Sequence, residues 1–117
     1  MLTSGEVVDL DLGMPEGREA GFGHPAVVVT AQRILDAEPL VIQIVPITST
    51  IRSLGSEIVI APDPANGLDQ PSAAQCQHIR AVSPARVIDV RGNVGAVTLA
   101  QVRETIGLVI DVSPSGA

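Results

Sequence analysis

Residues 25–47 of the chain read PAVVVTAQRILDAEPLVIQIVPI and contain its most apolar segment. Residues 25–30 (PAVVVT) are rich in β-branched side chains, which is typical of a buried strand. Residues 40–47 (LVIQIVPI) are apolar at successive positions, so we predict a central strand that is buried on both faces. A polar turn joins the two segments. This stretch therefore predicts two strands inside a β-rich core.

The strand pattern continues on both sides of this pair. Residues 8–12 alternate apolar and acidic side chains, as expected of a strand with one wet face. Residues 57–61 (EIVIA) predict another strand, whereas residues 72–82 alternate less regularly. Short strands are predicted around residues 87–90 and 92–94. The ten or so residues between the first two strands form a charged, glycine-rich loop, which is long for a hairpin and typical of a binding element.

The C-terminal region changes to the spacing of a helix. Its apolar residues recur at intervals of three and four and form one stripe: Leu99, Val102, Ile106, Val109 and Ile110. Thr98 and Gln101 fit a capping box that would begin this helix. We therefore expect a mainly β protein, with a curled antiparallel sheet of short strands and a C-terminal α-helix. A chain of 117 residues predicts a single domain over residues 1–117.

The charge composition restricts how the chain could bind nucleic acid. The formal net charge is −6, and all seven basic residues are arginine. Phosphate binding depends on cations that release counterions. Because salt screens opposing charges beyond about 8–10 Å, an acidic protein can still bind RNA where arginines gather locally. The composition therefore requires a local site and excludes a broad basic face.

Composition also gives expectations about location and metal binding. The longest nearly apolar run, residues 39–47, is far shorter than the roughly 20 residues of a membrane-spanning helix, and we see no signal peptide. A single cysteine suits a reducing compartment, so we expect a soluble, cytoplasmic protein. Cys76 and His78 could share one strand face, but a core cysteine beside a surface histidine is the favoured interpretation. We predict no metal site.

Polar side chains with catalytic potential gather where strands begin or end. Glu19 and His24 border the long loop, and Thr48, Ser49 and Arg52 follow the central strand. Cleavage of RNA by its own 2′-hydroxyl needs a base, an acid and hydrogen-bond donors to the phosphate, which these side chains supply without metal. The simpler alternative is that the hydroxyl groups stabilise a turn and the charged groups are solvated.

The order of short motifs resembles a known family. The segments GEVVDLDLG, GREAGFGHPAVVVT, IVPITST and GLDQPSAAQCQHIRAV, followed by an apolar helix, are similar to the MazF/PemK (Kid) family of bacterial toxin endoribonucleases. The resemblance covers nearly the whole chain. It implies an SH3-like β-barrel of the MazF/PemK/CcdB type that forms a homodimer. It also implies cleavage of single-stranded RNA at selected sequences, without metal or cofactor, and neutralisation by a MazE-like antitoxin.

The resemblance assigns roles to individual positions. Thr48 matches the family's active-site threonine, and Glu19 matches the acidic residue of the first loop. Positions of substrate-contacting residues are occupied by Ser49, Gln77 and Arg80. Arg52 could balance the charge that develops during cleavage.

One position departs from the family pattern, because His24 stands where the family has a catalytic arginine immediately before the proline. Three explanations are open. His24 could act as the acid or base, since histidine exchanges protons near neutral pH. Another arginine, Arg18, Arg52 or Arg80, could supply the cation. Finally, the chain could be catalytically weak or inactive and act by binding a protein, either an antitoxin or a topoisomerase in the manner of CcdB.

Overall fold

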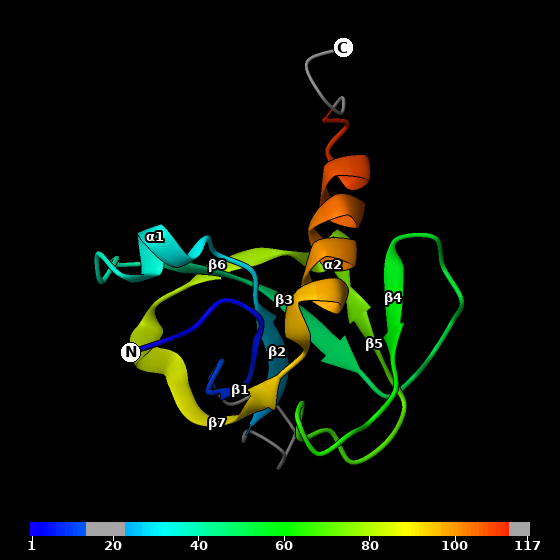
Figure 1. Cartoon of the computed structure of the whole chain (residues 1–117), viewed down its shortest axis with the longest axis horizontal. Helices are drawn as coiled ribbons and strands as arrows, with labels where there is room; N and C mark the ends of the chain where they lie inside the picture. The colour runs from blue at the N-terminus through cyan, green and yellow to red at the C-terminus, as the bar shows by residue number, and fades with distance from the viewer. Residues whose placement is uncertain (14–22, 113–117) are drawn as a thin grey trace.

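The computed structural model of the chain describes residues 1–13 and 23–112. Its strands and helices follow each other in the order β1-β2-α1-β3-β4-β5-η1-β6-η2-β7-α2 (Figure 1). The strands are β1 (Glu6–Leu10), β2 (His24–Val28), β3 (Ile42–Thr48), β4 (Glu57–Ile60), β5 (Ser72–Gln75), β6 (Arg80–Val82) and β7 (Val87–Asn93). The α-helices are α1 (Gln32–Leu35) and α2 (Gly95–Val109), and the 3₁₀ turns are η1 (Cys76–His78) and η2 (Pro84–Arg86).

The seven strands form one antiparallel sheet, in which six follow the order β4-β5-β3-β2-β1-β7 and β6 pairs with β3. Strand β3 pairs with β2 along one edge, while its other edge pairs first with β6, at Ile42 to Ile44, and then with β5, at Ile47 and Thr48. Strand β3 therefore pairs with two different strands, β6 and β5, along the same edge. This change of partner lets the sheet curl around its core, and the prediction of a curled antiparallel sheet with a C-terminal helix is confirmed.

The central strands are buried on both faces. On one face Val7, Val27 and Val45 pack with α2, β4 and β5 in a cluster that includes Val102 and Ile60. On the other face a second cluster joins these strands to α1 and β6: Val8, Leu10, Ala26, Val28, Leu35, Ile42, Ile44 and Val82. Double-sided burial explains why the apolar residues of β3 do not alternate with polar ones, whereas Leu40 and Val41 precede the strand and are exposed. It also explains why Val7 and Val8 are both fully buried, while the predicted alternation holds for Val8 and Leu10, which are buried, and for Asp9 and Asp11, which are partly exposed and exposed.

Helix α2 begins earlier than the sequence predicts. It starts at Gly95, whose positive φ of 88° is accessible to glycine, and the Gly95 N–H donates to Asn93 Oδ1 at 2.8 Å. Thr98 therefore lies inside the helix, and the predicted Thr98–Gln101 capping box is wrong. Of the predicted stripe, Leu99 and Val102 are buried. The final turns project beyond the sheet, which leaves the apolar residues after Gly107 largely exposed (Figure 1).

Three other segments differ locally from the sequence prediction. The polar turn after β2 contains the short helix α1. Residues 72–82 form two strands separated by η1, which accounts for their irregular alternation. The two short strands predicted near the end are one continuous strand, β7. In the described part of the chain, no helix is long and apolar enough to cross a bilayer.

Two glycines let the segment between β4 and β5 pack directly on β7. A Cβ atom at Gly92 would overlap the Ala65 carbonyl, and one at Gly67, where φ is +71°, would overlap the Arg91 carbonyl. The Asn93 N–H donates to the Ala65 carbonyl at 2.8 Å and fixes this contact. The backbone of residues 65–68 therefore lies against β7 at a distance that only glycine permits.

Substitution of Gly92 by alanine should destabilise the protein, because the added methyl group forces the two backbones apart. We expect Gly92→Ala to lower the free energy of unfolding by about 1–3 kcal/mol, as overpacking does elsewhere. Urea unfolding followed by circular dichroism measures the change. Gly55→Ala is the matched control, since nothing lies within 4 Å of a Cβ at that position. Equal stability of the two variants would contradict the close-packing argument.

Candidate active site

The pairing of β2 with β3 brings His24 and Thr48 to the same end of the sheet. The register pairs Val28 with Ile44, Val27 with Val45 and Ala26 with Pro46. The paired residues end there, so His24, the first residue of β2, and Thr48, the last residue of β3, both lie just beyond them at the same end of the two strands. Both side chains are partly exposed, so the two lie together at an accessible sheet end.

The hydroxyl group of Thr48 has a fixed environment. Thr48 Oγ1 accepts a hydrogen bond from the Thr50 N–H at 3.1 Å, which is the turn-stabilising contact that the simpler interpretation predicts. Because the oxygen acts as acceptor there, its own proton can be donated to another group. Ser49, the next residue, is exposed. Turn stabilisation and donation to a phosphate are therefore compatible at Thr48.

A polar cavity of about 310 Å³ opens beside Thr48. It is bounded by the ends of β2 and β3, by the segment before β5 and by β7, and its lining residues are Pro25, Ile47, Thr48, Ser49, Leu68, Asp69, Gln70, Ser72 and Arg91. We call this cavity the Thr48 pocket. His24 is not among its lining residues, because side chains alternate along β2 and Pro25 faces the pocket instead.

Arg91 is the basic residue of the Thr48 pocket, and nothing in the sequence pattern indicated it. Its Nε lies 3.1 Å from Asp9 Oδ1 and 3.0 Å from Asp9 Oδ2, so the carboxylate accepts from the inner nitrogen of the guanidinium group. Arg91 NH1 lies 4.0 Å from Asp69 Oδ2, and the Asp69 side chain is 91% exposed. Arg91 therefore has a firm partner on β1 and a loose one at the pocket rim.

The wall that carries Asp69 is held by a buried asparagine. Asn66 is 2% exposed, and its side-chain oxygen accepts from the N–H groups of Asp63 and Leu68, while its amide nitrogen donates to the Ala61 carbonyl. The Asn66 side chain thus forms hydrogen bonds with the backbone groups of a tight turn, as asparagine side chains commonly do. The turn before β5 therefore holds a defined shape next to β7.

Three predicted substrate contacts lie outside the pocket. Gln77 Nε2 donates to the buried Glu57 Oε2 at 2.8 Å, and Arg52 NH1 lies 3.9 Å from the same oxygen. Arg80 begins β6 opposite Ile44, four residues along β3 from Thr48. Two of these side chains thus surround a buried carboxylate and the third belongs to another part of the sheet. Their roles as substrate contacts stay predictions, and Glu19 and Arg18 lie outside the described residues.

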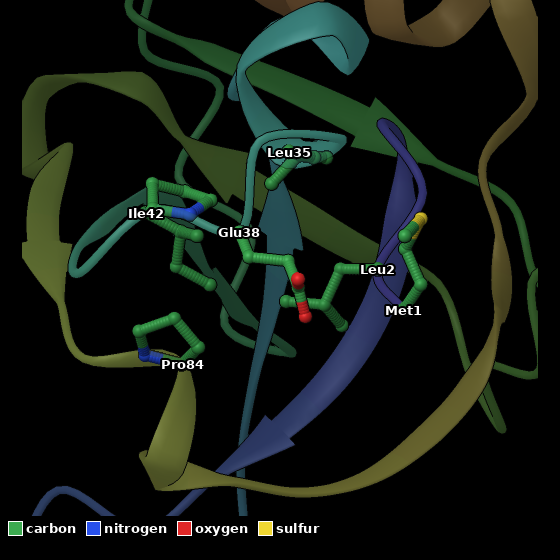
Figure 2. Close-up of a pocket in the computed structure, with 7 residues that line it drawn as sticks. Met1, Leu2, Leu35, Glu38, Ile42 and Pro84 are labelled. Carbon is green, nitrogen blue, oxygen red and sulfur yellow. The ribbon is translucent and has the colours of Figure 1, made fainter.

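A second cavity, of about 270 Å³, lies at a different place on the protein. Figure 2 shows its lining, which combines Met1, Leu2, Leu35, Ile42 and Pro84 with the carboxylate of Glu38. Glu38 is the charged group of this cavity, and its other lining residues are apolar. The side chains that line the second cavity offer neither a hydroxyl group nor a cation to a phosphate. The Thr48 pocket is therefore the candidate active site.

Comparison with known proteins identifies the family of this chain. Residues 3–110 match the family described as PemK-like, MazF-like toxin of type II toxin-antitoxin system. The chain is 34% identical over 116 residues to a protein of Mycobacterium tuberculosis named Endoribonuclease MazF9, a match that covers 96% of this chain and 98% of that protein. This chain belongs to the MazF/PemK toxin family.

Solved structures of MazF toxins share its fold. The Mycobacterium tuberculosis toxin MazF-mt6 superposes with a TM-score of 0.74 at 22% identity, covering 92% of this chain and 98% of that one. An endoribonuclease from a mycobacterial species, solved in complex with its cognate antitoxin, gives a TM-score of 0.77 at 16% identity and covers 98% and 100% of the two chains. The predicted MazF-type barrel is confirmed. The alternative of a purely protein-binding barrel receives no support from these relatives.

The Cys76–His78 pair of this MazF-like chain does not form a reactive site. Cys76 is fully buried in the core and its Sγ lies 3.7 Å from the Val102 carbonyl, whereas His78 is exposed. Burial raises the pKa of the Cys76 thiol to about 11. The interpretation of a core cysteine beside a surface histidine is therefore the one that fits the structure.

Cys76 should resist alkylation while the protein is folded. The thiolate is the reactive form, and a thiol whose pKa is raised to about 11 stays protonated at pH 8. We expect no modification by iodoacetamide at pH 8 over a time in which a free thiol reacts fully, and complete modification in denaturant. Mass spectrometry of the intact protein gives both extents. Rapid modification of the folded protein would contradict the burial of this side chain.

Proposed function

We propose that this MazF-like toxin cleaves single-stranded RNA at the end of the sheet where β2 begins and β3 ends. The proposal is supported by the location of His24 and Thr48 at the same end of the sheet, where Thr48 lines a polar pocket. The relative MazF9 is named an endoribonuclease, and this chain matches nearly all of it. The site offers a group that exchanges protons, two hydroxyl donors and a nearby cation. These are the requirements for cleavage by a ribose 2′-hydroxyl.

The reaction is a transesterification in which the RNA supplies its own nucleophile. His24 accepts the proton of the 2′-hydroxyl, and the oxygen attacks the adjacent phosphorus. The bond from phosphorus to O2′ forms as the bond to O5′ breaks, so one product ends in a 2′,3′-cyclic phosphate. The leaving 5′-oxygen takes a proton from water, and the hydroxide that results recovers the proton held by His24. Charge and atoms balance without metal or cofactor.

Thr48 and Ser49 stabilise the phosphate as its negative charge grows. Thr48 Oγ1 is held by the hydrogen bond from the Thr50 N–H, so the oxygen is positioned before the substrate arrives and its proton remains available to the phosphate. Donors that are aligned in advance lower the barrier because they need no reorganisation during the reaction. Glu19 is proposed to position His24 or to share the base role, and Ser49, Arg52, Gln77 and Arg80 to contact the RNA.

Removal of the His24 or the Thr48 side chain should abolish RNA cleavage. We expect His24→Ala and Thr48→Ala each to lower the cleavage rate of a long single-stranded RNA, in a buffer containing a chelator, by about 10²-fold or more. Wild-type protein should give discrete fragments under the same conditions. Gel electrophoresis of end-labelled RNA measures the rate and maps the cut.

Two variants serve as matched controls. His78→Ala removes the other histidine, which is exposed on η1, and Thr98→Ala removes a threonine inside α2, where alanine is a favourable helix residue. Both should cut at the wild-type rate. Undiminished cleavage by the His24 and Thr48 variants would disprove the site, and intact RNA with wild-type protein would disprove the function.

The same proposal includes a partner, an assembly and a location. A solved relative forms a complex with its cognate antitoxin, and we propose a MazE-like antitoxin for this chain, which acts as a homodimer in the cytoplasm. Exposed apolar side chains at the end of α2 supply surface that association would bury: Leu108, Val109, Ile110 and Val112.

An antitoxin should be encoded next to this chain. We expect the product of the short reading frame directly upstream to copurify with the toxin and to stop RNA cleavage at equimolar ratio. Copurification from co-expressing cells, followed by the cleavage assay, tests both parts. A protein of similar size and charge from an unrelated operon is the control. Cleavage that continues in a stable complex would contradict the inhibitory role.

A further inference from the structure

Arg91 supplies the positive charge of the Thr48 pocket. Among the described residues that line this pocket, Arg91 is the cation, and its side chain is 29% exposed. Arg52 and Arg80 are not lining residues, so neither provides charge inside it. A chain with a net charge of −6 needs a local cation wherever it binds a phosphate. The location of Arg91 meets that need.

Asp9 holds the guanidinium group in an orientation suited to binding an anion. Both carboxylate oxygens lie within 3.1 Å of Arg91 Nε, the inner nitrogen of the guanidinium group. The terminal nitrogens NH1 and NH2 are therefore available to other partners. Asp9 lies on β1 and its side chain is 17% exposed, so this support is held in a rigid part of the sheet. A planar fork presented in this way matches the oxygens of a phosphate.

Asp69 occupies the place of that anion in the unbound protein. Its Oδ2 lies 4.0 Å from Arg91 NH1, the limit of an ion pair, and its side chain is 91% exposed. The carboxylate is thus weakly held and can move into solvent. A phosphodiester carries the same single negative charge, so one anion can replace the other without a change in the charge of the pocket.

We propose that Arg91, oriented by Asp9, binds a backbone phosphate of the RNA, which displaces the Asp69 carboxylate. The inference rests on the proposed function and adds a substrate-binding residue to it. An alternative is that Arg91 forms a purely structural ion pair with Asp9. A structural pair stabilises the fold but leaves the salt dependence of RNA binding unchanged, so the two roles are separable.

The test measures binding of an oligonucleotide that cannot be cut, namely the mapped RNA sequence with 2′-deoxy substitution at the cleavage site. We expect Arg91→Met to weaken binding on the order of tenfold and to reduce the slope of log K against log salt concentration by about 0.7, the value for one phosphate contact on a single strand. Asp69→Asn should bind more tightly, because the competing anion is removed. In a protein that carries Arg91→Met, the same Asp69 substitution should lose most of its effect.

Two controls separate this role from stability and from total charge. Asp9→Asn breaks the same ion pair as Arg91→Met but keeps the cation, so it should retain the wild-type salt slope. Arg33→Met removes one arginine from α1, which follows the far end of β2, and should change neither affinity nor slope. If Arg91→Met fails to fold, as judged by circular dichroism, Arg91→Gln replaces it in every comparison.

The outcomes distinguish the two proposals. A wild-type protein that leaves RNA intact contradicts the proposed function. A wild-type protein that cuts RNA, with an Arg91 variant of unchanged affinity and salt slope, contradicts the role of Arg91 alone. A parallel loss of affinity in Asp9→Asn and Arg91→Met, with no change in slope in either variant, assigns the pair to structure and overturns the inference.

Discussion

The antiparallel register between β2 and β3 is the constraint on which the candidate active site depends. Val27 and Val45 are paired and fully buried, so the hydrophobic core fixes which residues stand opposite each other. A slip of one residue would turn every side chain of one strand to the other face. Burial of both faces makes such a slip especially costly, since each face carries its own core cluster. The location of His24 and Thr48 at one end of the sheet thus follows from packing several residues away.

The same sheet also decides where charge can gather in an acidic chain. Strand β1 lies between β2 and β7, so Asp9 has Pro25 on one side and the region of Arg91 on the other. Glycines at 67 and 92 then allow the turn that carries Asp69 to approach β7. Three segments that are distant in sequence thereby converge beside the exit of β3. Backbone packing, and not a cluster of basic residues along the chain, places Arg91 in the pocket.

The sequence contained enough information for the strands but not for the full site. Strands β2 and β3 were predictable because β-branched and apolar residues occur there without interruption, and Thr48 was identified through the family resemblance. The start of α2 was not predictable from capping rules, because Gly95 begins the helix with a positive φ that the pattern at Thr98 and Gln101 conceals. Arg91 was missed because its partner Asp9 is 82 positions away, and no local spacing reports such a contact.

The structure also explains why Arg91 and Arg52 are not equivalent candidates for phosphate binding, although each lies near a carboxylate. The Arg52 side chain is 53% exposed and approaches Glu57 Oε2 only to 3.9 Å, while Gln77 already donates to that oxygen at 2.8 Å. Because this contact is at the distance limit of an ion pair and the Arg52 side chain is half exposed, Arg52 would lose more conformational entropy on binding RNA than a preoriented arginine. Arg91 is held by two short contacts to one carboxylate before any ligand arrives. Preorganisation of the guanidinium group therefore favours the arginine on β7, even though Arg52 follows the central strand more closely in sequence.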